Sequence, residues 1–167
     1  MSILRRYHTC GNIYFIANVT FDRFPILVQS AELLIESIEA VRAKQPFELH
    51  AWVIMPDHFH FVVDPTGWDI STLMHSIKMS FGARYRKLLG QKSGRVWQNR
   101  FWDHIIRNQE DYNRHVDYVH YNPVKQGLVK SPFDWQWTSF HDYVREGLYR
   151  RDWGSKEIDW GKEDFGE

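Results

Sequence analysis

The segment from residue 47 to residue 64 constrains the fold more than any other part of the sequence. It contains two runs rich in β-branched and aromatic residues, 47–55 and 58–64, separated by Pro56-Asp57. Such runs predict strands, and a Pro-Asp pair between them is a turn signal. Strands joined by so short a turn pair antiparallel. The sequence therefore predicts a β-hairpin within an antiparallel sheet.

The rest of the chain alternates between strand and helix patterns. Two further segments have the composition of strands: 13–20 and 102–107. Three segments have apolar residues at helical spacing: 29–44, 70–89 and 109 to about 121. This order of elements predicts an α+β fold of ferredoxin-like type, with an antiparallel sheet of four to five strands covered by helices.

The last of these helices has a recognisable start and an expected end. Asn108 is a helix-capping residue, and Asp111 three positions later gives something close to a capping box. Pro123 disfavours helical geometry in the residue before it, so we expect the helix to end near residue 121. Residues 124–129 are expected to form a further short helical turn.

Composition indicates one domain with an uneven charge distribution. The chain has 167 residues and a formal net charge of zero. Residues 75–130 contain eleven Lys or Arg against four Asp or Glu, whereas residues 152–167 contain two against six. We expect one domain over residues 1–145 and an acidic tail over residues 146–167. Charge alone favours two oppositely charged solvated surfaces, although a basic block also suits a nucleic-acid partner.

Cysteine content and hydropathy bear on the compartment. Cys10 is the only cysteine, which excludes an internal disulfide and is typical of a reducing environment. No apolar run approaches the length of a membrane span. The sequence therefore predicts a cytoplasmic protein with no membrane partner.

His58 and His60 are the residues of the hairpin that most suggest chemistry. Side chains two positions apart in a strand project from the same face, so both imidazoles can reach one metal ion. An isolated His-x-His pair is more often structural than metal-binding. The interpretation therefore depends on what the rest of the chain adds.

The helix beginning near residue 109 adds a phenol and an amide. Tyr118 and Asn122 are four residues apart, which places them on one helix face. Two imidazoles and an amide oxygen leave open positions on Mg²⁺ or Mn²⁺ for phosphate oxygens, and a metal-bound phosphate is easier to attack. A phenol held in line can then form a covalent ester. Tyr112 and Tyr121 lie on the same helix, so spacing alone leaves three candidate nucleophiles.

These residues belong to longer motifs that resemble a known family. Residues 51–63 (AWVIMPDHFHFVV) resemble the HUH box of the single-tyrosine HUH transposases. Residues 118–129 (YVHYNPVKQGLV) resemble the tyrosine motif of one branch, the REP-associated tyrosine transposases. Residues 94–102 (GRVWQNRFW) and 134–139 (DWQWTS) also match that branch. The resemblance covers about residues 5–145.

The resemblance implies a role for each site residue. His58 and His60 become metal ligands for Mg²⁺ or Mn²⁺, and Tyr118 becomes the catalytic nucleophile. Asn122 becomes the third metal ligand, at a position where insertion-sequence relatives usually carry Gln. The implied reaction cuts single-stranded DNA to leave a 5′-phosphotyrosine and a free 3′-OH, and then rejoins strands. The implied partner is hairpin DNA of REP-type palindromes. A monomer is expected, with a homodimer as the alternative.

The resemblance also gives the basic residues a role along the DNA. Six residues are expected to contact phosphates or bases: Arg5, Arg6, Lys78, Arg84, Arg95 and Arg100. We expect the acidic tail to screen this path and hold activity down. Two other functions remain open from the sequence. One is a domesticated hairpin-binding protein that does not cut DNA. The other is a zinc-dependent hydrolase, for which two histidines without a nearby acidic ligand are a poor fit.

Overall fold

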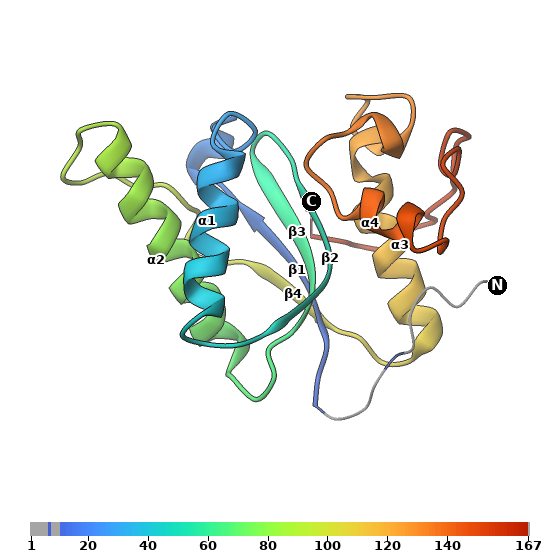
Figure 1. Cartoon of the computed structure of the whole chain (residues 1–167), viewed down its shortest axis with the longest axis horizontal. Helices are drawn as coiled ribbons and strands as arrows, with labels where there is room; N and C mark the ends of the chain where they lie inside the picture. The colour runs from blue at the N-terminus through green and yellow to red at the C-terminus, as the bar shows by residue number, and fades with distance from the viewer. Residues whose placement is uncertain (1–6, 8–10, 167) are drawn as a thin grey trace.

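A four-stranded antiparallel sheet forms the centre of the molecule (Figure 1). The structure, a computed structural model, describes residue 7 and residues 11–166. The strands lie in the order β2-β3-β1-β4, with bounds β1 (Tyr14–Val19), β2 (Glu48–Ile54), β3 (His58–Asp64) and β4 (Trp102–Ile105). The predicted α+β ferredoxin-like sheet is therefore confirmed, and the predicted hairpin is the pair β2–β3.

Helices cover both faces of this sheet. On one face lie α1 (Ala31–Arg42) and α2 (Ile70–Leu88), and on the other lie α3 (Gln109–Lys125) and the short α4 (Phe140–Arg145) (Figure 1). In the part of the chain that the structure describes, no helix combines the length and the apolar character needed to cross a membrane.

Each face of the sheet has its own apolar core, because strand side chains alternate between faces. Phe59 and Phe61 of β3 pack with the buried residues of α1 and α2. Val62 and the neighbouring Phe15 of β1 pack with those of α3. Burial of each phenylalanine contributes roughly 2–3 kcal/mol. Because Phe59 and Phe61 point toward α1 and α2, the alternation turns His60 toward α3.

Helix α3 is longer than the sequence predicts. The expected end near residue 121 is wrong, since the helix passes through Pro123 and ends at Lys125. A proline removes its own N–H donor and crowds the preceding turn, but the next turn still closes, with the Gln126 N–H donating to the Asn122 carbonyl at 2.9 Å. Tyr121 and Asn122 are both buried, so packing holds them helical despite the following proline.

The described part of the tail, residues 146–166, packs on the α3 side of the molecule (Figure 1, orange to red). Tyr149 and Phe165 are buried in the core that contains α3, and Trp153 and Trp160 pack against it partly buried. Aromatic side chains therefore hold the tail against the rest of the molecule.

Candidate active site

The α3 face of the sheet brings four sequence-predicted site residues together. His60 in β3 and Tyr118 in α3 have ring centroids 5.6 Å apart, and the ring of His58 lies 4.9 Å from that of His60. Asn122 is one turn after Tyr118, and its Oδ1 lies 3.3 Å from Nε2 of His58. All four side chains are buried. Strand alternation and helix periodicity thus converge on one location.

Asp57 fixes the orientation of the His58 ring. Oδ1 of Asp57 lies 2.7 Å from Nδ1 of His58, so Nδ1–H donates to the carboxylate and Nε2 is directed to the other side, toward Asn122. This hydrogen bond holds the pKa of Asp57 below its usual value, although burial raises it. Arg23 lies 3.3 Å from the second carboxylate oxygen. The sequence indicated Asp57 only as a turn residue, and its position directly before His58 was the available signal.

Nε2 of His58 faces the amide oxygen of Asn122. The two atoms are 3.3 Å apart, a distance at which either a proton or a cation can be shared between them. Imidazole nitrogen and amide oxygen both suit a divalent cation. With His60 beside them, the residues present fit a divalent metal ion.

Aromatic rings and one cation enclose the side chain of Tyr118. The ring of Phe165 stacks on it with centroids 3.7 Å apart and an interplanar angle of 5°, and Trp160 meets it edge-on at 5.3 Å. Nζ of Lys125 donates to the Tyr118 hydroxyl at 2.8 Å. The sequence alone indicated no contact of Lys125 or Phe165 with Tyr118.

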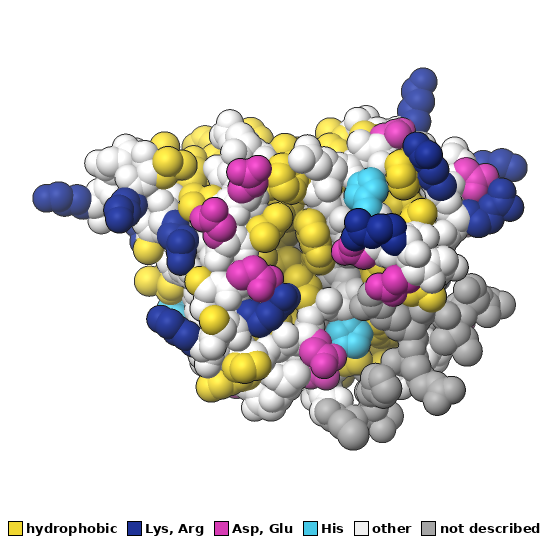
Figure 2. All heavy atoms as spheres, viewed as in Figure 1, with side chains coloured by type: hydrophobic (Ala, Val, Ile, Leu, Met, Phe, Trp, Pro, Cys, Tyr) yellow, Lys and Arg dark blue, Asp and Glu magenta, His cyan; other side chains and the backbone are white. Residues whose placement is uncertain are grey.

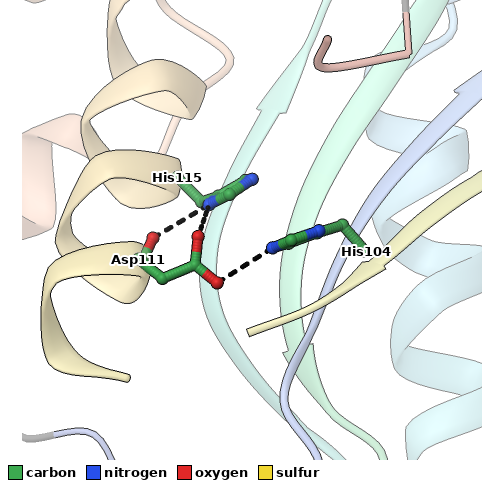
Figure 3. Close-up of side chains that lie close together, drawn as sticks. All are labelled: His104, Asp111 and His115. Carbon is green, nitrogen blue, oxygen red and sulfur yellow. Dashed lines mark hydrogen bonds and ion pairs between the residues drawn. The ribbon is translucent and has the colours of Figure 1, made fainter. Parts of the chain in front are cut away.

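A second polar cluster lies near the start of α3 (Figure 3). Nε2 of His104, from β4, lies 2.9 Å from Asp111, and Nδ1 of His115 lies 3.1 Å from the same carboxylate. Three of their donor atoms lie within 4.8 Å of one another, close enough to hold a divalent metal. Arg107 lies 3.4 Å from this carboxylate and opposes a cation there.

Protonation in this cluster follows its hydrogen bonds. Burial raises the pKa of Asp111, but hydrogen bonds from His104 and from the Arg107 backbone hold it below its usual value. Burial lowers the pKa of His115. The cluster is therefore a carboxylate between two imidazoles. His104 is hydrogen-bonded to the carboxylate, and Nδ1 of His115 is hydrogen-bonded to the Asp111 backbone carbonyl at 2.8 Å. No local pattern in the sequence indicates this cluster, because His104 and His115 meet only when β4 packs beside α3.

The chain matches known transposases over most of its length. Residues 11–122 match the family model described as transposase IS200 like. A REP-associated tyrosine transposase of Escherichia coli (strain K12) is 40% identical over 162 residues, which cover 95% of this chain and 94% of that protein. The chain belongs to the REP-associated tyrosine transposases. A putative REP-associated tyrosine transposase of Haemophilus influenzae is 35% identical over 171 residues, covering 92% of this chain and 94% of the relative.

Two solved structures have a similar fold. A REP-associated tyrosine transposase bound to a REP hairpin has a TM-score of 0.81 and 37% identity, covering 100% of this chain and 98% of that one. A putative transposase from Deinococcus radiodurans has a TM-score of 0.51 and 17% identity, covering 74% and 95%. The second similarity shows the fold alone.

Two of the basic residues assigned to DNA lie together in this family member. Lys78 on α2 and Arg95 line a cavity of about 260 Å³ between α2 and the segment 94–99, and His75 and Arg86 line it too. Burial and the nearby Arg95 lower the pKa of Lys78. Arg84 is also on α2 but lines a different cavity, against α1.

The other assigned residues do not join this cavity. Arg100 is exposed to solvent, and Arg5 and Arg6 lie outside the described residues. Figure 2 shows Lys and Arg side chains mixed with Asp and Glu over the face in view. The described basic side chains therefore form no continuous basic patch on that face.

Proposed function

We propose that this protein is a metal-dependent single-stranded DNA endonuclease and strand transferase that acts on REP-type hairpins through a 5′-phosphotyrosine on Tyr118. The observation that carries this proposal is the packing of Tyr118 against His60, in a site that also contains His58 and Asn122. A phenol beside a group of metal ligands is placed to attack a metal-bound phosphate. Similarity to a transposase solved on a REP hairpin supports the choice of DNA.

The metal we propose is Mg²⁺ or Mn²⁺, held by His58, His60 and Asn122. When bound, such an ion polarises the scissile phosphate as a Lewis acid. Asp57 orients the His58 ring by accepting the hydrogen bond from Nδ1, so that Nε2 is the nitrogen that would face the ion. The protein's own part is therefore to present two imidazoles and an amide oxygen on one side of the phosphate.

The reaction we propose balances without an external energy source. The Tyr118 oxygen, after losing its proton to solvent, forms a bond to phosphorus as the P–O3′ bond breaks. The electron pair stays on O3′, which takes a proton from water. In strand joining, a 3′-OH loses its proton to solvent and attacks the phosphotyrosine, and the electron pair returns to the Tyr118 oxygen, which takes a proton from water. The ester conserves the energy of the cleaved phosphodiester.

The cavity beside α2 is the best candidate for a DNA phosphate site. Among the described residues, Lys78, Arg86 and Arg95 form no ion pair with a carboxylate, so a phosphate would be their first anionic partner. Like charges held this close favour an anion between them.

This cavity lies at the same end of the sheet as the histidines. The Gln98 N–H donates to the Val19 carbonyl at 3.0 Å, and Val19 pairs with His58 across the β1–β3 ladder. A DNA strand leaving the metal ligands at the start of β3 could therefore continue into the cavity. We propose this route as part of the DNA path.

We further propose that the active form is a monomer in the cytoplasm, where chromosomal DNA is accessible. His58 and His60 come from the sheet and Tyr118 from α3 of one chain, so a second copy is not needed to complete the group.

One observation favours a second candidate function, a hairpin-binding protein that does not cut. Phe165 lies flat on Tyr118, so its ring has to move before the tyrosine can engage a phosphate. A protein that keeps this contact would bind hairpins without forming the covalent ester.

A single assay separates the two functions. The full chain is incubated with labelled single-stranded hairpin and Mn²⁺, and covalent adduct is measured on a denaturing gel beside hairpin binding. We expect an adduct that Tyr118→Phe abolishes while binding is retained, and that Tyr112→Phe and Tyr121→Phe preserve. Binding without any adduct from the wild-type protein would select the second candidate. An adduct that survives Tyr118→Phe would refute the assignment of the nucleophile.

A further inference from the structure

Two carboxylates and one imidazole gather at the end of β3 opposite the proposed active site. Glu48 begins β2 and Asp64 ends β3, and the two residues pair directly across the ladder. His50 follows two positions after Glu48. Donor atoms of all three side chains lie within 4.8 Å of one another. His58 begins the strand that Asp64 ends, so this group is roughly 20 Å from His58 at about 3.3 Å per residue.

A β-bulge places the side chain of His50 in this group. The pairing of β2 with β3 shifts register at His50, which is the extra residue of its strand. Bulges redirect side chains, and His50 points to the α3 side of the sheet, where it contacts Tyr112. Asp64 is two residues beyond Val62, which packs in the core on that side, so Asp64 and its partner Glu48 face the same way.

Two tyrosines hold His50 in place. Nδ1 of its ring lies 2.8 Å from the hydroxyl of Tyr112 on α3, and its backbone carbonyl accepts from the hydroxyl of Tyr143 on α4 at 2.7 Å. His50 is buried, with 8% of its surface exposed. Nε2 is the nitrogen directed to the carboxylates, 3.7 Å from Oε2 of Glu48. A hydrogen bond at the other ring nitrogen is the usual way in which proteins orient a histidine ligand.

The two carboxylates lie together without a basic side chain to compensate them. Among the residues that the structure describes, Glu48 pairs only with His50, and Asp64 forms no ion pair. Oδ1 of Asp64 accepts from the Thr66 N–H at 2.8 Å, which fixes this carboxylate while Oδ2 stays available to a ligand. Like charges directly opposite each other in a ladder are destabilising. A cation between the two carboxylates would relieve this repulsion.

We propose that Glu48, His50 and Asp64 bind a divalent transition-metal ion, with Zn²⁺ as the best match. Zn²⁺ accepts both imidazole nitrogen and carboxylate oxygen, and water can complete a four-coordinate shell. Ca²⁺ prefers shells of oxygen alone, so the imidazole disfavours it. This site shares no residue with the proposed active site and does not rest on the proposed function. The bound ion would join β2 to β3 and, through Tyr112, to α3.

The test measures Zn²⁺ binding to the full chain by calorimetric titration. It uses the His60→Ala background, which removes one proposed ligand of the active-site metal. Glu48→Gln and Asp64→Asn keep the shape of each side chain, and Glu36→Gln, at an exposed position on α1, is the matched control. Loss of a hydrogen bond to a metal ligand costs about 10- to 100-fold in affinity. Loss of a ligand itself should therefore weaken Zn²⁺ binding at least about tenfold, and the control should bind as its parent does.

Two results of this titration would overturn the proposal. One is an absence of Zn²⁺ binding in His60→Ala alone, which would leave the active site as the only place for zinc. The other is an affinity that neither Glu48→Gln nor Asp64→Asn changes in that background, which would locate the zinc at other residues.

A second measurement locates the ion directly. Crystals of the full chain are grown with Zn²⁺, and anomalous diffraction is recorded at the zinc absorption edge. We expect a peak at about 2 Å from Nε2 of His50 and from an oxygen of each of the two carboxylates. No anomalous peak among these three side chains would refute the site, whatever zinc is found elsewhere in the crystal.

Discussion

At the scale of single residues, a carboxylate directly before His58 decides which ring nitrogen is available to a metal. Asp57 accepts the hydrogen bond from Nδ1 at 2.7 Å, which leaves Nε2 directed at Asn122. Carboxylates in this position typically raise metal affinity 10- to 100-fold. In the proposed site, Asp57 would therefore help to position a metal ion together with the three proposed ligands.

Asp57→Asn should weaken Mn²⁺ binding about tenfold, because an amide is a poorer acceptor for the imidazole N–H. The affinity can be measured by calorimetric titration of Mn²⁺ into the DNA-free protein. Asp103→Asn, at an exposed position on β4, is the control and should bind as wild type does. Equal affinities for Asp57→Asn and wild type would show that the ring of His58 is oriented by packing alone.

Asp117 gives a residue-scale prediction about stability. Burial raises its pKa to about 6, although the Tyr149 hydroxyl donates to it at 2.5 Å. A carboxyl with a raised folded pKa favours the folded state most at low pH, and this contribution is lost as the pH rises through about 6. The gap from the usual value corresponds to at most ~3 kcal/mol.

Asp117→Asn should therefore be more stable than wild type at pH 7.5 by about 1–3 kcal/mol, and the gain should shrink at pH 4.5. Denaturant unfolding at both pH values measures the free energy of unfolding. A gain of the same size at both pH values would contradict the assigned protonation.

Single residues also show what the sequence could and could not predict. His58 and His60 share a face because alternation is a property of the strand backbone, and Tyr118 and Asn122 share one because helical periodicity is equally general. Lys125 contacts Tyr118 through the conformation of its long side chain, and Phe165 contacts it through the course of the tail. No local sequence pattern determines either of these, so neither contact could be predicted from the sequence.

At the scale of elements, the two ends of α3 differ in how well they could be predicted. Asn108 was expected to cap the helix, and its side chain accepts from the Asp111 N–H at 2.9 Å. The other end was predicted four residues too early, because the local preference before Pro123 was weaker than the burial of Asn122. A cap is a local interaction, whereas the position of the last turn is decided by packing against the rest of the fold.

The cavity between α2 and the segment 94–99 gives an element-scale prediction. Lys78→Ala and Arg95→Ala should each weaken hairpin binding. Each should also reduce the slope of log affinity against log salt concentration by about one, because one phosphate contact is lost. The affinity is measured over a series of salt concentrations. Arg145→Ala, on α4 across the sheet, is the control and should keep the wild-type slope. Unchanged slopes in both cavity variants would exclude the cavity from the DNA path.

At the scale of the whole molecule, the tail reaches across the α3 face to the proposed nucleophile. Arg114 of α3 pairs with Glu163 and also donates to the Trp160 carbonyl, and Phe165 then stacks on Tyr118. We expected the acidic tail to hold activity down by screening the DNA path. In this arrangement the group that would restrain the reaction is the apolar ring of Phe165, which covers Tyr118.

A single substitution at Gly166 should weaken the docking of the tail. Its φ of +78° disfavours any side chain, and an added methyl would overlap the side chain of Trp102. Gly166→Ala should raise the rate of adduct formation about fivefold, the effect of roughly 1 kcal/mol lost from docking. Gly161→Ala is the matched control, since it has a similar φ without the overlap, and its increase should be smaller. No increase in either variant would show that docking of the tail does not limit the reaction.

The histidines on the sheet and the tyrosine on α3 belong to one chain. This arrangement predicts whether two inactive variants can restore activity when they are mixed. A mixture of His60→Ala and Tyr118→Phe proteins contains every functional group, but no single molecule holds a complete set. Such a mixture should stay as inactive as its components in the adduct assay, whereas a transposase that shares sites between subunits would regain activity. In genetic terms, two defective copies of this protein should fail to complement each other.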